Sequence, residues 1–221
     1  MGICAVIELR DVSFSYPNGL KVFENMNFHL HKGDRVGIVG PNGSGKTTLL
    51  HLIVGLIKPD AGEVVVFGTP RKTEKDFREV RKRVGLLFQD PEDQLFCPTV
   101  AEDVAFGPLN LRIPKDEVHR IVKRTLEEVG LAGFEERVTY NLSGGEKKLV
   151  SLATLFAMSP EVLLLDEPTA GLDENATEKI EQILRDKVET YIVVSHHREV
   201  LEKTTDKIFR MEDSRLIRVS I

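Results

Sequence analysis

The stretch GPNGSGKT at residues 40–47 constrains the fold of this chain more than any other feature. It follows RVGIV, an apolar run typical of a buried strand, and precedes KTTLLHLIVGLI, an apolar run of helix length. Glycines in such a loop let backbone N–H groups close around phosphate oxygens, and the helix N-terminus adds partial positive charge. A glycine-rich turn that ends in Lys-Thr by chance is the alternative. The strand–loop–helix context favours a nucleoside triphosphate site.

The side chains of this loop have separate predicted parts in binding. Lys46 is expected to reach the β- and γ-phosphates, and the Thr47 hydroxyl is expected to bind Mg²⁺. The other predicted nucleotide-binding residues of the loop are Gly40, Pro41, Asn42, Gly43, Ser44, Gly45 and Thr48. The sequence therefore predicts a nucleotide bound together with Mg²⁺.

A second apolar strand, in VLLLDEPT at residues 162–169, ends in two acids. The end of a strand in an open sheet faces the same crevice as the phosphate loop. Asp166 is then the predicted Mg²⁺ carboxylate. Glu167, one residue later, can hold the attacking water as a general base. The alternative is that Glu167 only caps the turn before Pro168.

The stretch LSGGE at residues 142–146 is predicted to begin a helix. Ser143 and Glu146 have the spacing of a capping box, which by itself explains both residues. Gly144 and Gly145 would also expose the helix N-terminus, which is the geometry of an anion site. One chain cannot bring this helix and the phosphate loop to one γ-phosphate if a helical segment holds them apart. Two chains packed head to tail could.

Strands and helices alternate along the chain, which predicts right-handed βαβ connections and an α/β fold with an open, mainly parallel sheet. The expected strands include 6–16, 35–40, 62–68, 84–89, 162–166 and 190–195, and the expected helices include 99–109, 114–130, 143–160 and 174–187. A hairpin around Asp213 and Ser214 is expected to end the chain.

Composition limits the classes of partner. The formal net charge of −5 and the absence of a basic cluster argue against nucleic acid as a partner. The longest apolar runs have the length of strands and are too short to span a bilayer. Cys4 and Cys97 lie far apart and form no CxxC, which favours two free thiols in a reducing cytosol. We expect a cytoplasmic chain without a membrane anchor of its own.

Five motifs together resemble those of ABC-type ATPase domains, in order and in spacing. They are GPNGSGKT, Gln89, LSGGE, LLLDEPTAGLD and the VVSHH at 193–197, and the resemblance covers essentially the whole chain. It implies a P-loop ABC ATPase fold that hydrolyses ATP with Mg²⁺ as a dimer. The mainly parallel core, with an antiparallel β edge, is expected at 1–89 and 161–221, and a helical lobe at 90–160.

The resemblance also implies roles for single residues. Tyr16 is similar to the aromatic residue that stacks on adenine, although packing on its own strand is the alternative. Gln89 resembles the glutamine that joins Mg²⁺ to the helical lobe. Ser143, Gly144 and Gly145 would contact the γ-phosphate held by a second ABC ATPase subunit, and Asp173 would line the dimer seam. His196 resembles the histidine that contacts the γ-phosphate.

Two departures from the family pattern concern its later motifs. His197 lies where the family often has Asp, so either histidine could face the site. We favour His196, because it directly follows Ser195 and the strand. The stretch EKKLVSLA replaces the commoner Gln-Arg-type continuation of the helix that follows LSGG. Neither departure removes a group that takes part in the chemistry.

The stretch QDPEDQLFCPTVAEDVAFGPLN at residues 89–110 resembles the energy-coupling-factor subgroup of importer ATPases. In that subgroup the segment forms a groove for a helix of an integral-membrane coupling subunit. The resemblance implies that Leu95 and Phe96 give that helix an apolar contact, and that the acids of 90–93 contact its basic residues. The alternative is that the apolar residues fill the core beneath a loop.

The resulting hypothesis is an ATPase subunit, peripheral on the inner face of the cell membrane, that powers uptake of a metal ion or vitamin. A soluble ABC protein without a transport role would need a second cassette, a long coiled coil or a zinc insertion, and the sequence shows none. An ATP-sensing regulatory module should have lost Glu167 or His196, and both are present. The solute, and whether the dimer partner is identical, stay open.

Overall fold

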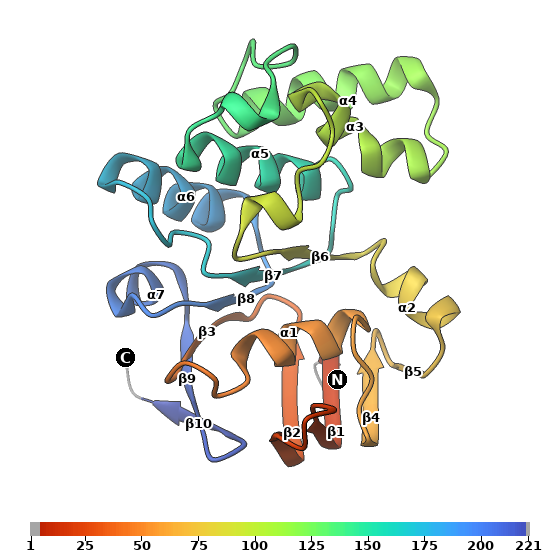
Figure 1. The fold of residues 1–221 in the computed structure, drawn as a ribbon, viewed down its shortest axis with the longest axis vertical. Coiled ribbons are helices and arrows are strands. Elements are labelled where there is room, and N and C mark those ends of the chain that lie inside the picture. Colours follow the sequence, from red (N-terminus) through yellow and green to blue (C-terminus); the bar gives the residue numbers. More distant parts are fainter. Residues whose placement is uncertain (1–4, 220–221) are drawn as a thin grey trace.

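Two sheets and a layer of helices make up the computed structural model, which describes residues 5–219 (Figure 1). The first is a four-stranded antiparallel sheet in the order β2-β1-β4-β5. Its strands are β1 (Ala5–Ser15), β2 (Lys21–His31), β4 (Ala61–Val66) and β5 (Thr69–Arg71). The expected antiparallel edge is thus a sheet of its own. Cys4 lies outside the described residues.

The second sheet has six strands in the order β10-β9-β3-β8-β7-β6. Its strands are β3 (Arg35–Val39), β6 (Val84–Leu87), β7 (Val162–Asp166), β8 (Tyr191–Val194), β9 (Lys207–Glu212) and β10 (Arg215–Val219). All neighbours pair in parallel except β9 and β10, which form the expected terminal hairpin. The parallel register brings the carboxyl ends of four strands, β3, β8, β7 and β6, to one edge.

Helix α1 (Lys46–Val54) lies between the two sheets (Figure 1). Its leucines, with the inner faces of β1, β2 and β4, form one apolar core. Strand β7 explains how the parallel sheet serves two cores, since successive side chains point to opposite faces. Leu164 belongs to the core around α1, while Leu163 and Leu165 belong to a second core under the helical layer. A strand buried on both faces reads as the continuous apolar run seen in the sequence.

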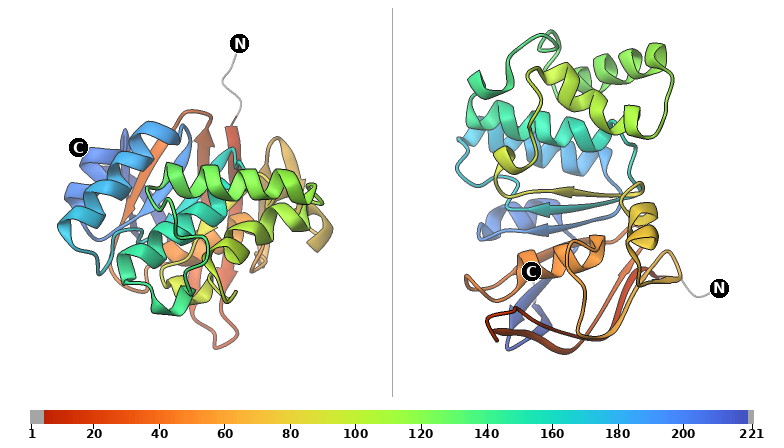
Figure 2. Two further views of the ribbon diagram at one scale, coloured as in Figure 1. Left: turned by 90° about the horizontal axis from the view of Figure 1, so that it is seen from above. Right: turned by 45° about the vertical axis from the view of Figure 1, so that its right-hand side comes forward.

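The helical layer covers the other face of the parallel sheet (Figure 2). It contains α3 (Val100–Asn110), α4 (Lys115–Glu128), α5 (Gly144–Phe156) and α6 (Glu174–Lys187). Shorter helices are α2 (Glu74–Val80), α7 (Arg198–Thr204) and the 3-10 turns η1 (Pro91–Asp93) and η2 (Thr139–Asn141). Within residues 5–219, no helix combines the length and the apolar character that crossing a membrane requires.

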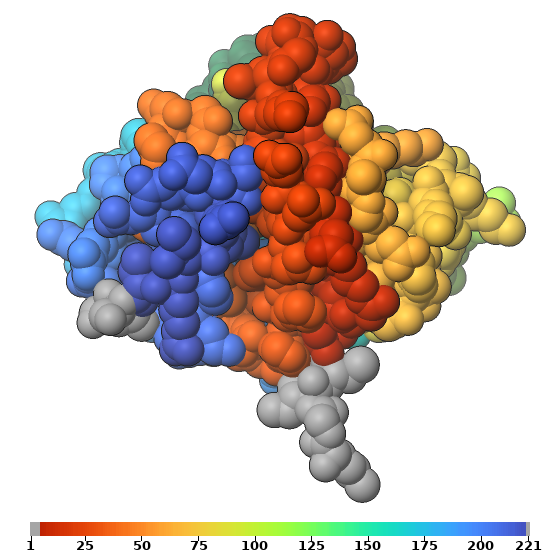
Figure 3. Space-filling model, turned by 90° about the horizontal axis from the view of Figure 1, so that it is seen from below, coloured from red at the N-terminus to blue at the C-terminus, as the bar shows by residue number. Residues whose placement is uncertain are grey.

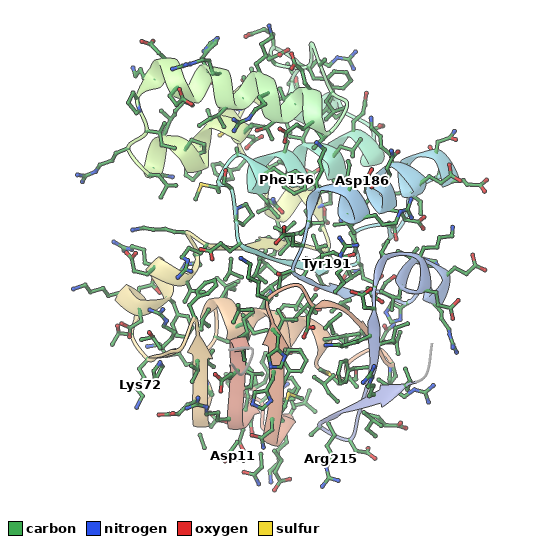
Figure 4. The ribbon with its side chains drawn as sticks, turned by 180° about the vertical axis from the view of Figure 1, so that it is seen from behind. Asp11, Lys72, Phe156, Asp186, Tyr191 and Arg215 are labelled. Carbon is green, nitrogen blue, oxygen red and sulfur yellow. The ribbon has the colours of Figure 1, made fainter. Side chains whose placement is uncertain are left out.

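Buried polar contacts join the layers at the middle of the molecule. Tyr191 on β8 is fully buried, and its hydroxyl donates to the carbonyl oxygen of Thr204 at the end of α7 (Figure 4). The antiparallel sheet lies at the end of the molecule that faces away from the helical layer. There β1 and β2 run between the β9–β10 hairpin and the segment that holds β4 and β5 (Figure 3). The predicted site residues that follow β3, β6, β7 and β8 lie at the carboxyl edge of the parallel sheet, because these strands run parallel.

Candidate active site

A cleft of about 430 Å³ opens where β3, β6, β7 and β8 end. In open α/β sheets this edge is the usual place for a ligand. The lining residues come from the segments that follow these strands, from α1, and from the turn between β1 and β2 together with the start of β2: Tyr16, Leu20, Val22, Asn42, Gly43, Gly45, Lys46, Thr47, Thr48, Gln89, Asp166, Glu167 and His196. The structure thus brings together residues from four of the five motifs.

The phosphate loop leads directly into α1. Gly45 precedes the helix with φ at 101°, and a side chain there would lie 2.5 Å from Val22 Cγ1, so only glycine fits. Lys46 begins the helix, and its ammonium donates to the carbonyl oxygens of Gly40 and Pro41 at 2.9 Å each. The lysine therefore closes the loop on itself, with its ammonium within the cleft that the loop borders.

Burial and nearby acids act in opposite directions on Lys46. Loss of water lowers the pKa of its ammonium, while the negative charges of Glu167 and Asp166 raise it, and the net shift is downward. The Ser44 hydroxyl oxygen is buried nearby in the same loop and has no hydrogen-bond partner within the described residues. A buried polar atom without a partner is uncommon and is expected where a ligand supplies the missing bond.

Thr47 and Asp166 meet across the cleft. The Thr47 hydroxyl donates to Asp166 Oδ2 at 2.6 Å, and Asp166 is itself buried. One residue on, the Thr48 hydroxyl lies 2.9 Å from the Tyr16 hydroxyl. Tyr16 also packs edge-to-face on Phe14, with ring centroids 5.0 Å apart. Tyr16 therefore has both a packing contact within its strand and a place on the cleft wall.

Glu167 has an unusual backbone and an unsatisfied carboxylate. Its φ is 47°, a left-handed value that costs energy for a residue other than glycine and is often found at functional sites. The side chain is 4% exposed, and Oε1 is buried without a hydrogen bond from the described residues. The His196 Nε2 lies 3.3 Å from this oxygen, but the two atoms do not form a hydrogen bond. The carboxylate is thus available to a ligand or a water.

The two adjacent histidines, His196 and His197, have different positions in the structure. His196 lines the cleft, and its backbone N–H donates to Glu167 Oε2 at 3.3 Å. His197 instead caps the start of α7, and its N–H donates to the Ser195 hydroxyl. Of the two residues left open by the sequence, His196 is the one that the structure brings to Glu167.

The LSGG segment lies apart from the cleft. Ser143 and Glu146 form the predicted capping box at the start of α5, with Ser143 N donating to Glu146 Oε2 at 2.8 Å. Gly145 approaches α6 so closely that a side chain would lie 3.2 Å from Ala176 Cβ. Asp173 caps that helix by accepting from Ala176 N at 2.8 Å. Among the described residues, the wall of the cleft does not include Ser143, Gly144 or Gly145.

The expectation that Leu95 is open to a partner is wrong. Leu95 is 7% exposed and packs in the core of the helical layer. Phe96 is 65% exposed and packs edge-to-face on Phe106, with ring centroids 4.8 Å apart. Both residues follow the 3-10 turn η1. The Leu95 N–H donates to the carbonyl oxygen of Pro91, whereas the Phe96 N–H donates to Asp103 Oδ1 on α3. The core-filling alternative therefore holds for Leu95 and not for Phe96.

Sequence reasoning missed the polar residues that shape this segment. The buried carboxylate of Asp103 accepts from the amides of Phe96 and Cys97, at 3.1 and 3.0 Å, and from the Thr139 hydroxyl. Asp103 lies in the first turn of α3, where an acid is ordinarily explained by the helix dipole alone. The sequence therefore offered no reason to expect that the Asp103 carboxylate also accepts hydrogen bonds from the backbone of residues 96 and 97.

Comparison with known proteins gives one family. The family model described as ABC transporter matches residues 23–170. The energy-coupling factor transporter ATP-binding protein EcfA of Methanocaldococcus jannaschii is 46% identical over 217 residues, which cover 96% of this chain and 78% of that protein. EcfA of Methanothermobacter thermautotrophicus is 45% identical, with 96% and 70% covered.

Solved structures agree with this result. CbiO1 of Clostridium perfringens, part of the ABC transporter complex CbiONQ, has a TM-score of 0.86 and 32% identity, with 96% of this chain and 87% of that chain covered. A dimeric ATP-binding cassette in a post-hydrolysis state with ADP and Pi has a TM-score of 0.85 and 27% identity, with 95% and 96% covered. The chain therefore belongs to the ABC transporter ATP-binding proteins, with the energy-coupling-factor ATPases among its relatives, and is an ATPase.

Proposed function

We propose that this chain powers an importer of the energy-coupling-factor class, taking up a metal ion or vitamin through a membrane partner. The observation that carries the ATPase part is the convergence of Lys46, Thr47, Asp166, Glu167 and His196 on one cleft. The names of the relatives support the transport part.

In this proposal the phosphates of ATP bind at the N-terminus of α1. Backbone N–H groups of residues 40–47 and the Lys46 ammonium would contact the β- and γ-phosphates. The adenine would stack on Tyr16, whose position on the cleft wall supports that contact. The partner-free Ser44 hydroxyl lies in the same loop and would gain a hydrogen bond on binding.

The residues beside the phosphate loop fit Mg²⁺. Thr47 and Asp166 already bring a hydroxyl and a carboxylate oxygen to 2.6 Å of each other, and the Gln89 side chain lines the same cleft. Mg²⁺ prefers such oxygen ligands and shares its coordination with nucleotide phosphates. When bound, it would neutralise charge that develops on the phosphates. These three residues would hold it.

Glu167 is the proposed general base. Its buried Oε1 has no hydrogen bond within the described residues, so it can accept a proton from a water molecule. His196 lies on the same side of the cleft at 3.3 Å from that oxygen and would orient the γ-phosphate and the water. Proton transfer to Glu167 as the water attacks phosphorus would release ADP and phosphate.

Two chains are proposed to complete two sites. Ser143, Gly144 and Gly145 begin α5 away from the cleft of their own chain. An exposed helix N-terminus that carries two glycines suits the γ-phosphate of a nucleotide held by another subunit. Asp173, which caps the neighbouring helix α6, would line the same seam. The dimeric arrangement of a similar cassette supports this reading.

The membrane partner is proposed to bind at Phe96. Phe96 lines a groove of about 380 Å³, whose apolar lining also includes Leu56, Leu86, Phe88, Phe106 and Met158. Exposed aromatic side chains beside a groove suit an amphipathic helix. Asp93, one of the acids at 90–93, also lines this groove and would contact a basic residue of that helix. Peripheral attachment to the inner face of the membrane follows from this contact.

Reconstitution tests the proposal. Purified chain should hydrolyse ATP only with Mg²⁺ present, and this activity should rise when the chain is assembled with its membrane subunit in vesicles. Solute uptake should then depend on ATP. ATP hydrolysis that neither binds nor responds to any membrane subunit encoded beside this chain would contradict the transport part while leaving the ATPase in place.

A further inference from the structure

Lys148 is a buried lysine that the proposed chemistry does not use. It lies on α5, is 2% exposed, and sends its ammonium away from the apolar core toward the end of β6. There Nζ donates to the carbonyl oxygen of Gln89 at 2.6 Å and to that of Phe88 at 3.3 Å. Burying a charge is costly unless it is paired and hydrogen-bonded, so these two contacts call for an explanation.

The two carbonyl groups belong to the backbone that carries the Gln89 side chain into the cleft. Gln89 itself is exposed and lies beyond the end of β6, where the strand's ladder no longer supports it. A loop without ladder hydrogen bonds needs other partners to keep one conformation. Lys148 provides such partners at the residue that enters the site.

The following residues are also attached to α5. The Gln94 amide nitrogen donates to Ser151 O and to the Thr154 hydroxyl, both at 2.8 Å, while Gln94 Oε1 accepts from Phe88 N at 3.3 Å. The Lys147 ammonium pairs with Glu92. The segment from Phe88 to Gln94 is thus hydrogen-bonded to α5, the helix whose N-cap is Ser143.

Charge in the cleft favours the ammonium form of Lys148. Burial lowers its pKa, and the negative charges of Asp90, Asp166 and Glu167 act in the opposite direction, with a net downward shift. The Lys148 side chain connects α5 to the backbone of Gln89, a residue that lines the cleft.

We propose that Lys148 is a positioning residue for ATP hydrolysis: it fixes the backbone at Phe88 and Gln89, so that the Gln89 side chain moves together with the helix that carries Ser143–Gly145. This inference rests on the proposed role of Gln89 in the cleft. The Gln89 side chain would then keep its place on the wall of the cleft only while Lys148 joins the loop to α5.

A double-mutant cycle tests the assignment. Lys148→Met keeps the length and apolar body of the side chain but removes the donor, and turnover should fall roughly 10–100-fold, as small misplacements of a catalytic group do. The KM for ATP should change little, since Lys46 and the phosphate loop are untouched. Lys148→Met combined with Gln89→Ala should lose no more turnover than Gln89→Ala alone, because residues that act as a unit are not additive. Additive losses would overturn the proposal.

Hydrogen exchange gives a readout that does not need activity. In Lys148→Met, the backbone amides of residues 88–90 and 92–94 should exchange faster, while the amides of α5 should stay protected. Faster exchange throughout α5 would show a role in core packing instead. Lys123→Met is the matched control, because Lys123 is an exposed residue on α4 of the same lobe; it should change neither exchange nor turnover.

A second variant covers the case in which Lys148→Met does not fold. Lys148→Gln retains a donor of shorter reach, and it should fold and show the same local exchange increase to a smaller degree. Failure of both variants to fold would overturn the proposal in favour of a structural role. If wild-type chain shows no ATPase activity, the proposed function fails, but the exchange experiment still decides whether Lys148 holds the loop.

Discussion

Thr47 and Asp166 are 119 positions apart in the sequence, yet the Thr47 hydroxyl donates to Asp166 Oδ2 at 2.6 Å. The parallel sheet explains this contact. Strand β8 lies between β3 and β7, and the register pairs Ile38 with Val194 and Val194 with Asp166. The phosphate loop after β3 and the acids at the end of β7 therefore reach one edge of the sheet.

The first prediction concerns Glu167. Glu167→Gln should retain ATP binding and lose roughly 10²–10⁴-fold in turnover, the usual contribution of a positioned general base. Because bound ATP is then not hydrolysed, the dimer should accumulate, and light scattering at saturating ATP can measure the dimer fraction. Glu161→Gln, an exposed change at the other end of β7, is the control and should keep wild-type turnover. Near-normal turnover in Glu167→Gln would remove Glu167 from the mechanism.

The second prediction separates nucleotide binding from dimer closure. Lys46→Ala should weaken ATP binding itself, because it removes the cation that borders the cleft. Ser143→Arg should leave ATP binding to the single chain nearly intact, because Ser143 lies outside that chain's own cleft. It should abolish hydrolysis by blocking closure. Calorimetry at low protein concentration compares the two, and an equal loss of affinity would contradict the composite site.

The third prediction uses the contrast between Leu95 and Phe96. Leu95→Ala should lower the free energy of unfolding by about 2–5 kcal/mol, since it opens a cavity in the helical layer. Phe96→Ser should cost far less stability, because its side chain is 65% exposed. Phe96→Ser should retain ATPase activity and lose assembly with the membrane subunit. Thermal melts and a pull-down measure both, and a large fall in melting temperature for Phe96→Ser would argue against docking there.

The fourth prediction distinguishes stacking from strand packing at Tyr16. Tyr16→Phe keeps the ring and removes only the contact with the Thr48 hydroxyl, a loss of about 0.5–1.5 kcal/mol in stability. ATP affinity should stay within a few fold in this variant. Tyr16→Ala should weaken ATP binding strongly, but it should leave the affinity for inorganic triphosphate, which has no adenine, unchanged. Equal affinity of wild type and Tyr16→Ala for ATP would restrict Tyr16 to packing against Phe14.

The fifth prediction concerns pH and the capping box at α5. The amide of Ser143, and then its hydroxyl, hold the pKa of Glu146 below its ordinary value of 4.5. A carboxyl whose pKa is depressed by folding stabilises the protein above its ordinary pKa, and this contribution is lost as the pH falls through the lowered value. Gln at this position can still form the capping box, so Glu146→Gln should be less stable than wild type at neutral pH only by about 0.3–1 kcal/mol, the contribution of a negative charge near a helix N-terminus. Chemical denaturation should show the gap closing in acid, and a constant gap would count against the assignment.

The sequence alone determined the local chemistry of this protein. GPNGSGKT lies between an apolar strand and an apolar helix that adjoin it in the sequence, and its glycines can adopt the backbone conformations that a phosphate-binding loop requires, so the motif could be interpreted from adjacent residues alone. The capping box at Ser143 and the apolar run that became β7 are also properties of adjacent residues. A continuous apolar run is typical of a strand that is buried on both faces, as β7 is, and such strands occur mainly in parallel sheets. The run therefore predicted a parallel sheet.

Only the tertiary structure decided what lies next to what. The sequence could not tell which of Leu95 and Phe96 is buried, because both are apolar and only the packing of the helical layer distinguishes them. It also could not reveal that Lys148, one polar residue in a mostly apolar helix, reaches the carbonyl of Gln89 at 2.6 Å. Such contacts depend on how α5 packs against the end of β6, and packing is a property of the whole core rather than of any local pattern.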